Sequence, residues 1–203
     1  MKNIDLSFIN NPIDNSIPTY NKITSHELSI IDYFIKPNIN TYLEIGTFTG
    51  GTTHYLARKH KNVLFFTLSI TREIHNEINT GQPDHKEDII PQAEIGKLCK
   101  EDNNVIQIYG DSLNSQSWSI LPNQIDMVFI DGCHLSKYVK QDSINAYIRN
   151  PEVIIWHDTK SIGGVVKAIE SFENAYQEVI YNINTKLGLG IWVKNANTLH
   201  LDR

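Results

Sequence analysis

The stretch LEIGTFTGGTT occupies residues 43–53 and joins two different patterns of the sequence. Residues 41–45 form a short apolar run typical of a buried strand, and a helix is predicted from residue 52 to about residue 60. A strand that passes through glycines into a helix directs free backbone N–H groups toward a ligand. The stretch therefore predicts a nucleotide-like binding turn, with close packing as the alternative reason for its glycines.

The rest of the sequence alternates between β-branched apolar runs and helical patterns. Parallel strands are predicted at residues 63–68, 105–109, 125–130 and 153–156, with a helical stretch from about residue 71 and a helix over residues 135–148. Near-continuous apolar strands separated by helices are typical of a parallel sheet covered on both faces. Residues 178–183 and 189–193 then predict an antiparallel hairpin. The fold class is therefore α/β: a three-layer, doubly wound, mostly parallel sheet that ends in an antiparallel hairpin.

Two segments lack this regular pattern. Residues 1–23 contain Asn, Asp and Pro without periodicity and predict an irregular N-terminal arm, and residues 79–91 predict a loop that covers a ligand. Between them, Thr24 and Glu27 form a capping box that predicts the start of an amphipathic helix, which ends at Pro37.

Composition narrows the class of protein. The 203 residues include 18 basic and 23 acidic side chains, so the formal charge is -5 and nucleic acid is not the expected partner. The two cysteines, Cys99 and Cys133, make no disulfide framework, which favours a reducing compartment. Since the sequence contains no long apolar run, no membrane span is expected, and the predicted location is the cytoplasm.

Two common nucleotide-binding motifs fail at the glycine turn. A dinucleotide fingerprint that starts at Gly46 would need glycine where Phe48 stands, and an acidic residue is missing from residues 66–69. A phosphate-binding Walker loop would need a lysine before Thr52, where the sequence has Gly51. Nicotinamide enzymes and nucleoside triphosphatases are therefore disfavoured.

The turn resembles motif I of class I S-adenosylmethionine-dependent methyltransferases. Further segments resemble, in order, a bacterial family of these enzymes with FIDGxH and HD signatures: IYGDS (108–112), IDMVFIDGCH (125–134), VIIWHDT (153–159) and GGVVKAIESF (163–172). The resemblance covers nearly the whole chain after residue 24. It implies a Rossmann-like methyltransferase fold with a seven-stranded sheet, a single domain over residues 24–203, and S-adenosylmethionine as the cofactor.

The resemblance also implies a set of cofactor-binding residues. These are Glu44, Gly46, Thr47, Phe48, Thr49 and Gly50 at the turn, followed by Ser69, Asp111, Ser112 and Asp131. Asp111 matches the position that usually meets the adenine amino group, although the cap of a helix is an equal alternative for it. Relatives usually carry an acidic residue for the ribose where this chain has Ser69, and Glu73 is a candidate substitute. This departure predicts weakened cofactor binding.

Four ionisable residues follow two neighbouring predicted strands: Asp131, His134, His157 and Asp158. Three roles are open for them. In the first, His134 or His157 acts as the general base on a substrate hydroxyl, and Asp158 is counted with them as a catalytic residue. Asp131 and Asp158, with His157 or His134, could instead hold a divalent cation. In the third alternative, each histidine pairs with a carboxylate for structural reasons only.

These features predict an S-adenosylmethionine-dependent methyltransferase (EC 2.1.1.-) that methylates a hydroxyl group of a small molecule. The alternative is a methyltransferase-like domain that has lost efficient cofactor use and serves as a binding or assembly module. The chain could form a homodimer. The other histidines, His54 and His60 among them, have no such neighbours in sequence and are expected at solvated positions, whereas Asp142 is expected at a packing or surface position of its helix.

Overall fold

The computed structural model describes residues 1–9, 13, 23–78, 90–160 and 162–195. These residues form one sheet whose strands are β1 (Lys2–Ile4), β2 (Thr41–Ile45), β3 (Leu64–Ser69), β4 (Val105–Tyr109), β5 (Met127–Ile130), β6 (Val153–His157), β7 (Tyr181–Ile183) and β8 (Leu189–Val193). The helices are α1 (Ser25–Phe34), α2 (Gly51–Lys59), α3 (Arg72–Ile78), α4 (Ser115–Ser119), α5 (Ser136–Tyr147) and α6 (Gly163–Tyr176). The predicted loop at 79–91 lies outside the described residues, apart from its last two.

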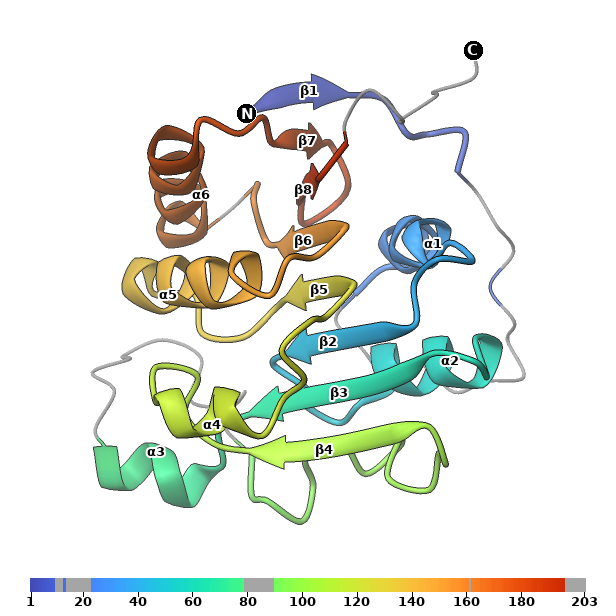
Figure 1. Cartoon of the computed structure of the whole chain (residues 1–203), viewed down its shortest axis with the longest axis vertical. Helices are drawn as coiled ribbons and strands as arrows, with labels where there is room; N and C mark the ends of the chain where they lie inside the picture. The colour runs from blue at the N-terminus through green and yellow to red at the C-terminus, as the bar shows by residue number, and fades with distance from the viewer. Residues whose placement is uncertain (10–12, 14–22, 79–89, 161, 196–203) are drawn as a thin grey trace.

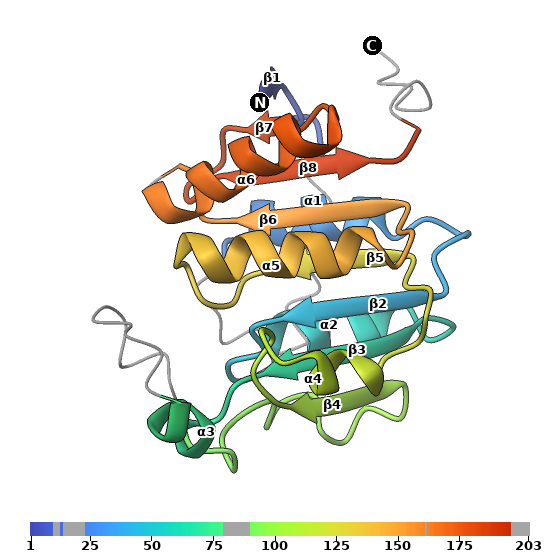
Figure 2. The ribbon, with the colours of Figure 1, turned by 60° about the vertical axis from the view of Figure 1, so that its left-hand side comes forward.

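The sheet has the order β1-β7-β8-β6-β5-β2-β3-β4 (Figure 1). All neighbouring strands pair in parallel except β8, which is antiparallel to both β6 and β7. In Figure 2 the arrows of β2 and β6 point the same way, and that of β8 is reversed. The α/β fold with a C-terminal antiparallel hairpin is therefore confirmed.

The N-terminal segment corrects one prediction. Lys2–Ile4 form a strand that pairs in parallel with β7, so the sheet has eight strands rather than seven, and this part of the arm is not irregular. The strand is only three residues long and continues a sheet edge that already exists. Residues 10–12 and 14–22 of the predicted arm lie outside the described part of the chain.

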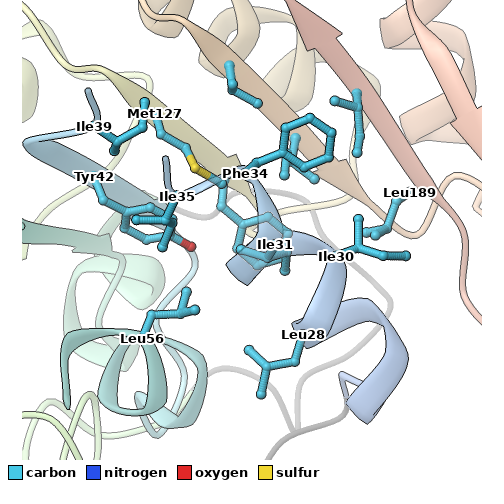
Figure 3. Close-up of a cluster of buried hydrophobic side chains, with 14 of the residues drawn as sticks. Leu28, Ile30, Ile31, Phe34, Ile35, Ile39, Tyr42, Leu56, Met127 and Leu189 are labelled. Carbon is cyan, nitrogen blue, oxygen red and sulfur yellow. The ribbon is translucent and has the colours of Figure 1, made fainter. Parts of the chain in front are cut away.

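The sheet separates two apolar cores because successive side chains of a strand point to opposite faces. In β2, Tyr42 joins the core beneath α1 and α2, whereas Leu43 joins the core beneath α5 and α6. Figure 1 shows these helix pairs on opposite sides of the sheet. Figure 3 shows apolar side chains of α1 gathered between Leu56 of α2 and the sheet residues Met127 and Leu189. The three-layer prediction is correct.

Helix α1 begins where its sequence predicts. The Thr24 side chain accepts a hydrogen bond from the backbone of Glu27, and the Glu27 side chain accepts one from the backbone of Thr24, which completes the capping box. The helix ends at Phe34, three residues before Pro37. In the described part of the chain, no helix is both long and apolar enough to cross a membrane.

Candidate active site

The glycine turn joins the carboxyl ends of neighbouring strands. The Gly46 N–H donates to the carbonyl of Leu68 at 2.9 Å, and the Asp131 N–H donates to the carbonyl of Ile45 at 2.8 Å. Gly46 has a φ of +97°, and a Cβ added there would lie 2.2 Å from the carbonyl oxygen of Asp131. Only glycine combines this conformation with such a close approach. The turn therefore places the end of β2 directly against Asp131.

A second segment packs over the same turn. The N–H groups of Gly96 and Leu98 donate to the carbonyls of Phe48 at 2.7 Å and Thr49 at 3.1 Å, respectively. A Cβ added at Gly50 would lie 2.9 Å from the Cα of Gly96. Close packing therefore explains why glycine stands at both positions 46 and 50. This agrees with the alternative reason that the sequence offered for these glycines. Phe48 nevertheless adopts a φ of +45°, a left-handed conformation that is uncommon for a bulky residue and often occurs at ligand sites.

Glu44 lies beneath the turn rather than at its surface. It is 2% exposed, and its carboxyl group accepts a hydrogen bond from the hydroxyl of Thr53 in the first turn of α2. Burial, reinforced by the negative charge of Asp131 and opposed by hydrogen bonds from threonines, raises the pKa of Glu44 to about 8. The residue is thus placed to hold β2 against α2.

The proposed ribose and adenine positions lie at the ends of β3 and β4. Ser69 is the last residue of β3, and its carbonyl accepts a hydrogen bond from the Gly110 N–H at 2.9 Å. Asp111 follows at once, and its Oδ1 accepts from the N–H of Leu113 at 3.0 Å in a local turn. The cap of α4 is Asn114, so the helix-cap alternative for Asp111 is wrong.

Glu73, the candidate substitute for the ribose carboxylate, has partners near its own position in the chain. It is exposed near the start of α3, and the pKa of its carboxyl group is lowered by hydrogen bonds from backbone N–H groups and from the hydroxyl of Thr71. The carboxylate is therefore held at the beginning of its own helix.

His157 is enclosed by carboxylates. Its side chain is 3% exposed; Nδ1 lies 2.9 Å from Asp131 Oδ1, and Nε2 lies 3.7 Å from Glu27 Oε2. Nδ1 is also 3.5 Å from Asp158 Oδ2. Burial opposes the charged imidazole, but the surrounding carboxylates outweigh it and raise the pKa of His157 to about 12. The surrounding carboxylates therefore favour the charged form of the ring, and both of its nitrogens face carboxylate oxygens.

His134 forms a second, more accessible pair. Its Nε2 lies 2.9 Å from Asp158 Oδ2, and its side chain is 21% exposed. Burial opposes its charged form, but the interaction with Asp158 prevails and raises the pKa of His134. Asp158 has a left-handed φ of +60°, which aspartate tolerates better than most residues. A Cβ added at Gly164 would lie 2.4 Å from the His134 carbonyl oxygen, so the start of α6 packs against this residue.

One ligand atom each from Asp131, His134 and Asp158 lies within 4.8 Å of the others. Of the two histidines that the sequence left open for the cation set, this group contains His134 and not His157. All four predicted residues do meet at one edge of the sheet, because they lie at or just after the carboxyl ends of the neighbouring parallel strands β5 and β6.

A family model described as "Methyltransferase domain" matches residues 43–159, more than half of the 203 residues. The chain belongs to this methyltransferase family. The match spans the glycine turn and all four residues of the cluster, so the resemblance seen in the sequence is confirmed at the level of the family. A search of proteins with curated functions found no match.

Solved structures share the fold of this methyltransferase at low sequence identity. A putative caffeoyl-CoA O-methyltransferase from Staphylococcus aureus has a TM-score of 0.59 at 17% identity, with 88% of this chain and 86% of that chain covered. An O-methyltransferase from Bacillus cereus in complex with SAH has a TM-score of 0.57 at 17% identity, covering 88% and 85%. The O-methyltransferase TomG from Streptomyces achromogenes, in complex with SAM, has a TM-score of 0.57 at 15% identity, covering 84% and 80%.

The methyltransferase fold also buries charged residues that the sequence did not single out. His54 Nδ1 lies 2.6 Å from Asp102, and His60 Nε2 lies 2.7 Å from Asp32. His54 is buried and His60 half-buried, so the prediction of solvated positions is wrong for both. Their partners lie 48 and 28 residues away in sequence, and only the tertiary fold brings them together.

Asp142 on α5 of the methyltransferase is buried, and it gives a prediction for stability. Burial, opposed by a hydrogen bond from Ser112 and assisted by Asp111, raises its pKa from 3.8 to about 7. Between these values the folded chain retains a proton that the unfolded chain releases. Stability should therefore fall as pH rises, with a contribution of up to about 1.4 kcal/mol per pH unit, and this contribution should level off above the folded pKa.

Asp142→Asn should remove this contribution. Its urea-unfolding free energy is expected to depend less steeply on pH than that of the wild type between about pH 5 and about pH 7. The variant should also be the more stable protein above the folded pKa, since asparagine cannot ionise. Parallel curves for the two proteins would contradict the assignment.

Proposed function

We propose that this methyltransferase uses S-adenosylmethionine to methylate a hydroxyl group of a small molecule. The observation that carries the proposal is the partly exposed His134–Asp158 pair. It lies beside Asp131, whose backbone touches Gly46 in the glycine turn. The structural neighbours that are O-methyltransferases, two of them in complex with SAM or SAH, support this choice of cofactor and acceptor group.

The residues present fit the cofactor at two places. The turn leads into α2, whose N-terminus directs backbone N–H groups to the same edge of the sheet as Asp131. Asp111 uses only Oδ1 in its local turn, so Oδ2 remains as an acceptor for the adenine amino group. Glu44, Thr47, Thr49 and Ser112 would support the turn and flank the ring. When bound, S-adenosylmethionine supplies an electrophilic methyl group.

His134 is the general base in this proposal. Its Nε2 lies 2.9 Å from Asp158 Oδ2, and this carboxylate orients the imidazole, which accepts the proton from the substrate hydroxyl. His157 is unsuited to this task, since its ring is buried and both nitrogens face carboxylates. We assign it instead to holding Asp131 in place.

A divalent cation is the second candidate for activating the hydroxyl. The approach of Asp131, His134 and Asp158 to within 4.8 Å favours it. A mixed imidazole and carboxylate set suits Mn, Fe or Zn better than Mg, and such an ion would lower the pKa of a bound hydroxyl. If His157 were the ligand in place of His134, one of its ring nitrogens would have to give up its contact with Glu27 or Asp131 to bind the ion. We therefore favour His134 as the ligand.

The function is tested by calorimetric titration of the folded protein with S-adenosylhomocysteine. Binding is expected, whereas no heat at millimolar ligand would contradict the proposal. A panel of hydroxylated compounds, including catechols, sugars and polyketides, should then be screened with S-adenosylmethionine for release of S-adenosylhomocysteine. The acceptor with the fastest turnover serves as the probe substrate for the variants below.

Ser69 gives a gain-of-affinity prediction. Ser69→Asp restores a carboxylate at the end of β3, where charge-assisted hydrogen bonds to the ribose hydroxyls should contribute about 1.5–3 kcal/mol. We therefore expect S-adenosylhomocysteine to bind roughly tenfold more tightly or better.

Ser69→Asn is the matched control, because it has nearly the same shape as aspartate without its charge. An equal gain in both variants would argue against a ribose contact. If neither the wild type nor Ser69→Asp binds the nucleoside, the alternative of a binding or assembly module without cofactor use gains support.

A further inference from the structure

Glu27 joins helix α1 to the edge of the sheet that carries the cluster. It is 0% exposed, and its Oε2 accepts hydrogen bonds from the backbone N–H of Thr24 at 2.9 Å and from the Thr24 hydroxyl at 2.8 Å. A capping box needs no more than this, and glutamate is almost never fully buried unless it is paired. The complete burial of Glu27 therefore calls for a further explanation.

The other carboxylate oxygen of Glu27 is also fully engaged. Oε1 accepts hydrogen bonds from the hydroxyl of Thr185 at 2.7 Å and from the N–H of Leu187 at 2.9 Å, in the segment between β7 and β8. Burial opposes the charged form, but the neighbouring His157 and these donors prevail and lower the pKa of Glu27. Four hydrogen bonds thus hold a buried, charged carboxylate in one orientation.

This fixed carboxylate faces the imidazole of His157. Glu27 Oε2 lies 3.7 Å from Nε2, while Nδ1 on the opposite side of the ring lies 2.9 Å from Asp131. The same Nδ1 is 3.5 Å from Asp158. The ring could therefore turn toward either aspartate, and its orientation decides whether Asp158 remains available to His134.

We infer that Glu27 is a positioning residue for the methyl-transfer site. By anchoring Nε2 of His157, it keeps Nδ1 on Asp131 and leaves Asp158 to His134. The inference rests on the proposed function, in which the His134–Asp158 pair activates the substrate hydroxyl. Glu27 itself touches neither cofactor nor substrate, and it acts through His157.

Glu27→Gln tests this role, because glutamine is accepted in a capping box and has nearly the same volume. The variant should lose roughly tenfold or more in kcat with the probe acceptor, as is typical when the partner of an orienting histidine is removed. The variant should still bind S-adenosylhomocysteine, because Glu27 contacts Thr24, His157 and the β7–β8 segment rather than the glycine turn.

Thr185→Val is the matched control. It removes the hydrogen bond from the Thr185 hydroxyl to the same carboxylate, together with the one that this hydroxyl accepts from the Gly188 N–H, but keeps the charge that faces His157. The control should lose thermal stability and retain kcat. Equal losses of kcat in both variants would mean that Glu27 is only a clamp between α1 and the β7–β8 segment, which would overturn the inference.

Two further measurements cover the remaining outcomes. If Glu27→Gln does not fold, the variant Glu27→Asp is used instead. It keeps the negative charge but places it farther from His157 Nε2, and the same loss of kcat is expected.

NMR of the imidazole N–H protons provides a readout that does not depend on turnover. A protected Nε2–H signal of His157 in the wild type and in Thr185→Val, lost in Glu27→Gln, supports the anchor, and an unchanged signal contradicts it. Failure of S-adenosylhomocysteine binding by the wild type would instead reject the proposed function alone.

Discussion

Replacing His134 by glutamine is expected to lower kcat by about 100- to 10,000-fold, the usual contribution of a positioned general base. Glutamine can still place its amide nitrogen beside Asp158, where His134 Nε2 lies 2.9 Å from Oδ2. It cannot accept the proton of a substrate hydroxyl. The loss should therefore appear in kcat with the probe acceptor, while the affinity for S-adenosylhomocysteine should stay at its wild-type value.

His60→Gln is the matched control for this variant. His60 also directs Nε2 at an aspartate, with 2.7 Å to Asp32, but it lies at the opposite end of α2 from the glycine turn. Its replacement should affect stability and leave kcat unchanged. A wild-type kcat in His134→Gln would exclude His134 as the base.

A chelator distinguishes general-base catalysis by His134 from activation of the hydroxyl by a metal ion. If His134 acts as the base, wild-type turnover should be indifferent to EDTA. Loss of turnover in EDTA, with recovery on addition of Mn²⁺ or Zn²⁺, would instead assign Asp131, His134 and Asp158 to a metal ion. That outcome would also predict that His134→Gln weakens metal binding, which titration with the ion would measure directly.

The layers of the fold could be predicted because they depend on local patterns. The capping box at Thr24 and Glu27 marks the start of α1 by itself, and the apolar strands require cover on both faces. The strand Lys2–Ile4 could not be predicted, since it has three residues and takes its conformation from the partner strand Tyr181–Ile183. The five-residue helix Ser115–Ser119 was missed because it is too short to show a helical period.

The composition of the candidate site was likewise predictable, but the division of roles within it was not. Parallel strands end at the same edge of a sheet, so residues that follow β5 and β6 had to meet. Which histidine is buried depends on α1, whose Glu27 approaches His157 from a position 130 residues earlier in the chain. Neither periodicity nor spacing reports such a contact, and the choice of His134 as the base therefore needed the structure.

Gly46→Ala is expected to have the largest effect on stability among the substitutions considered. The backbone there has a φ of +97°, and forcing a side chain into such a conformation costs about 1–3 kcal/mol by itself. The added Cβ would also lie 2.2 Å from the carbonyl oxygen of Asp131, which is backbone and cannot turn aside. Either the turn or the end of β5 must move.

The displacement at Gly46 should disturb both the Asp131–His157 contact and the proposed cofactor-binding turn. A shift of β5 would carry Asp131 away from His157, and a shift of the turn would misplace Phe48 and the start of α2. We therefore expect Gly46→Ala to unfold at a clearly lower temperature and to lose binding of S-adenosylhomocysteine. Thermal unfolding and calorimetric titration measure the two effects separately.

Gly163→Ala is the matched control for Gly46→Ala, since a Cβ added at Gly163 meets nothing within 4 Å and the residue opens helix α6. Alanine there should leave binding unchanged and stabilise the chain by about 0.4–1 kcal/mol, because it restricts the unfolded state. Comparable losses in both variants would mean that α6 is unexpectedly sensitive. Full binding by Gly46→Ala would show that the cofactor site does not require the close approach of Gly46 to Asp131.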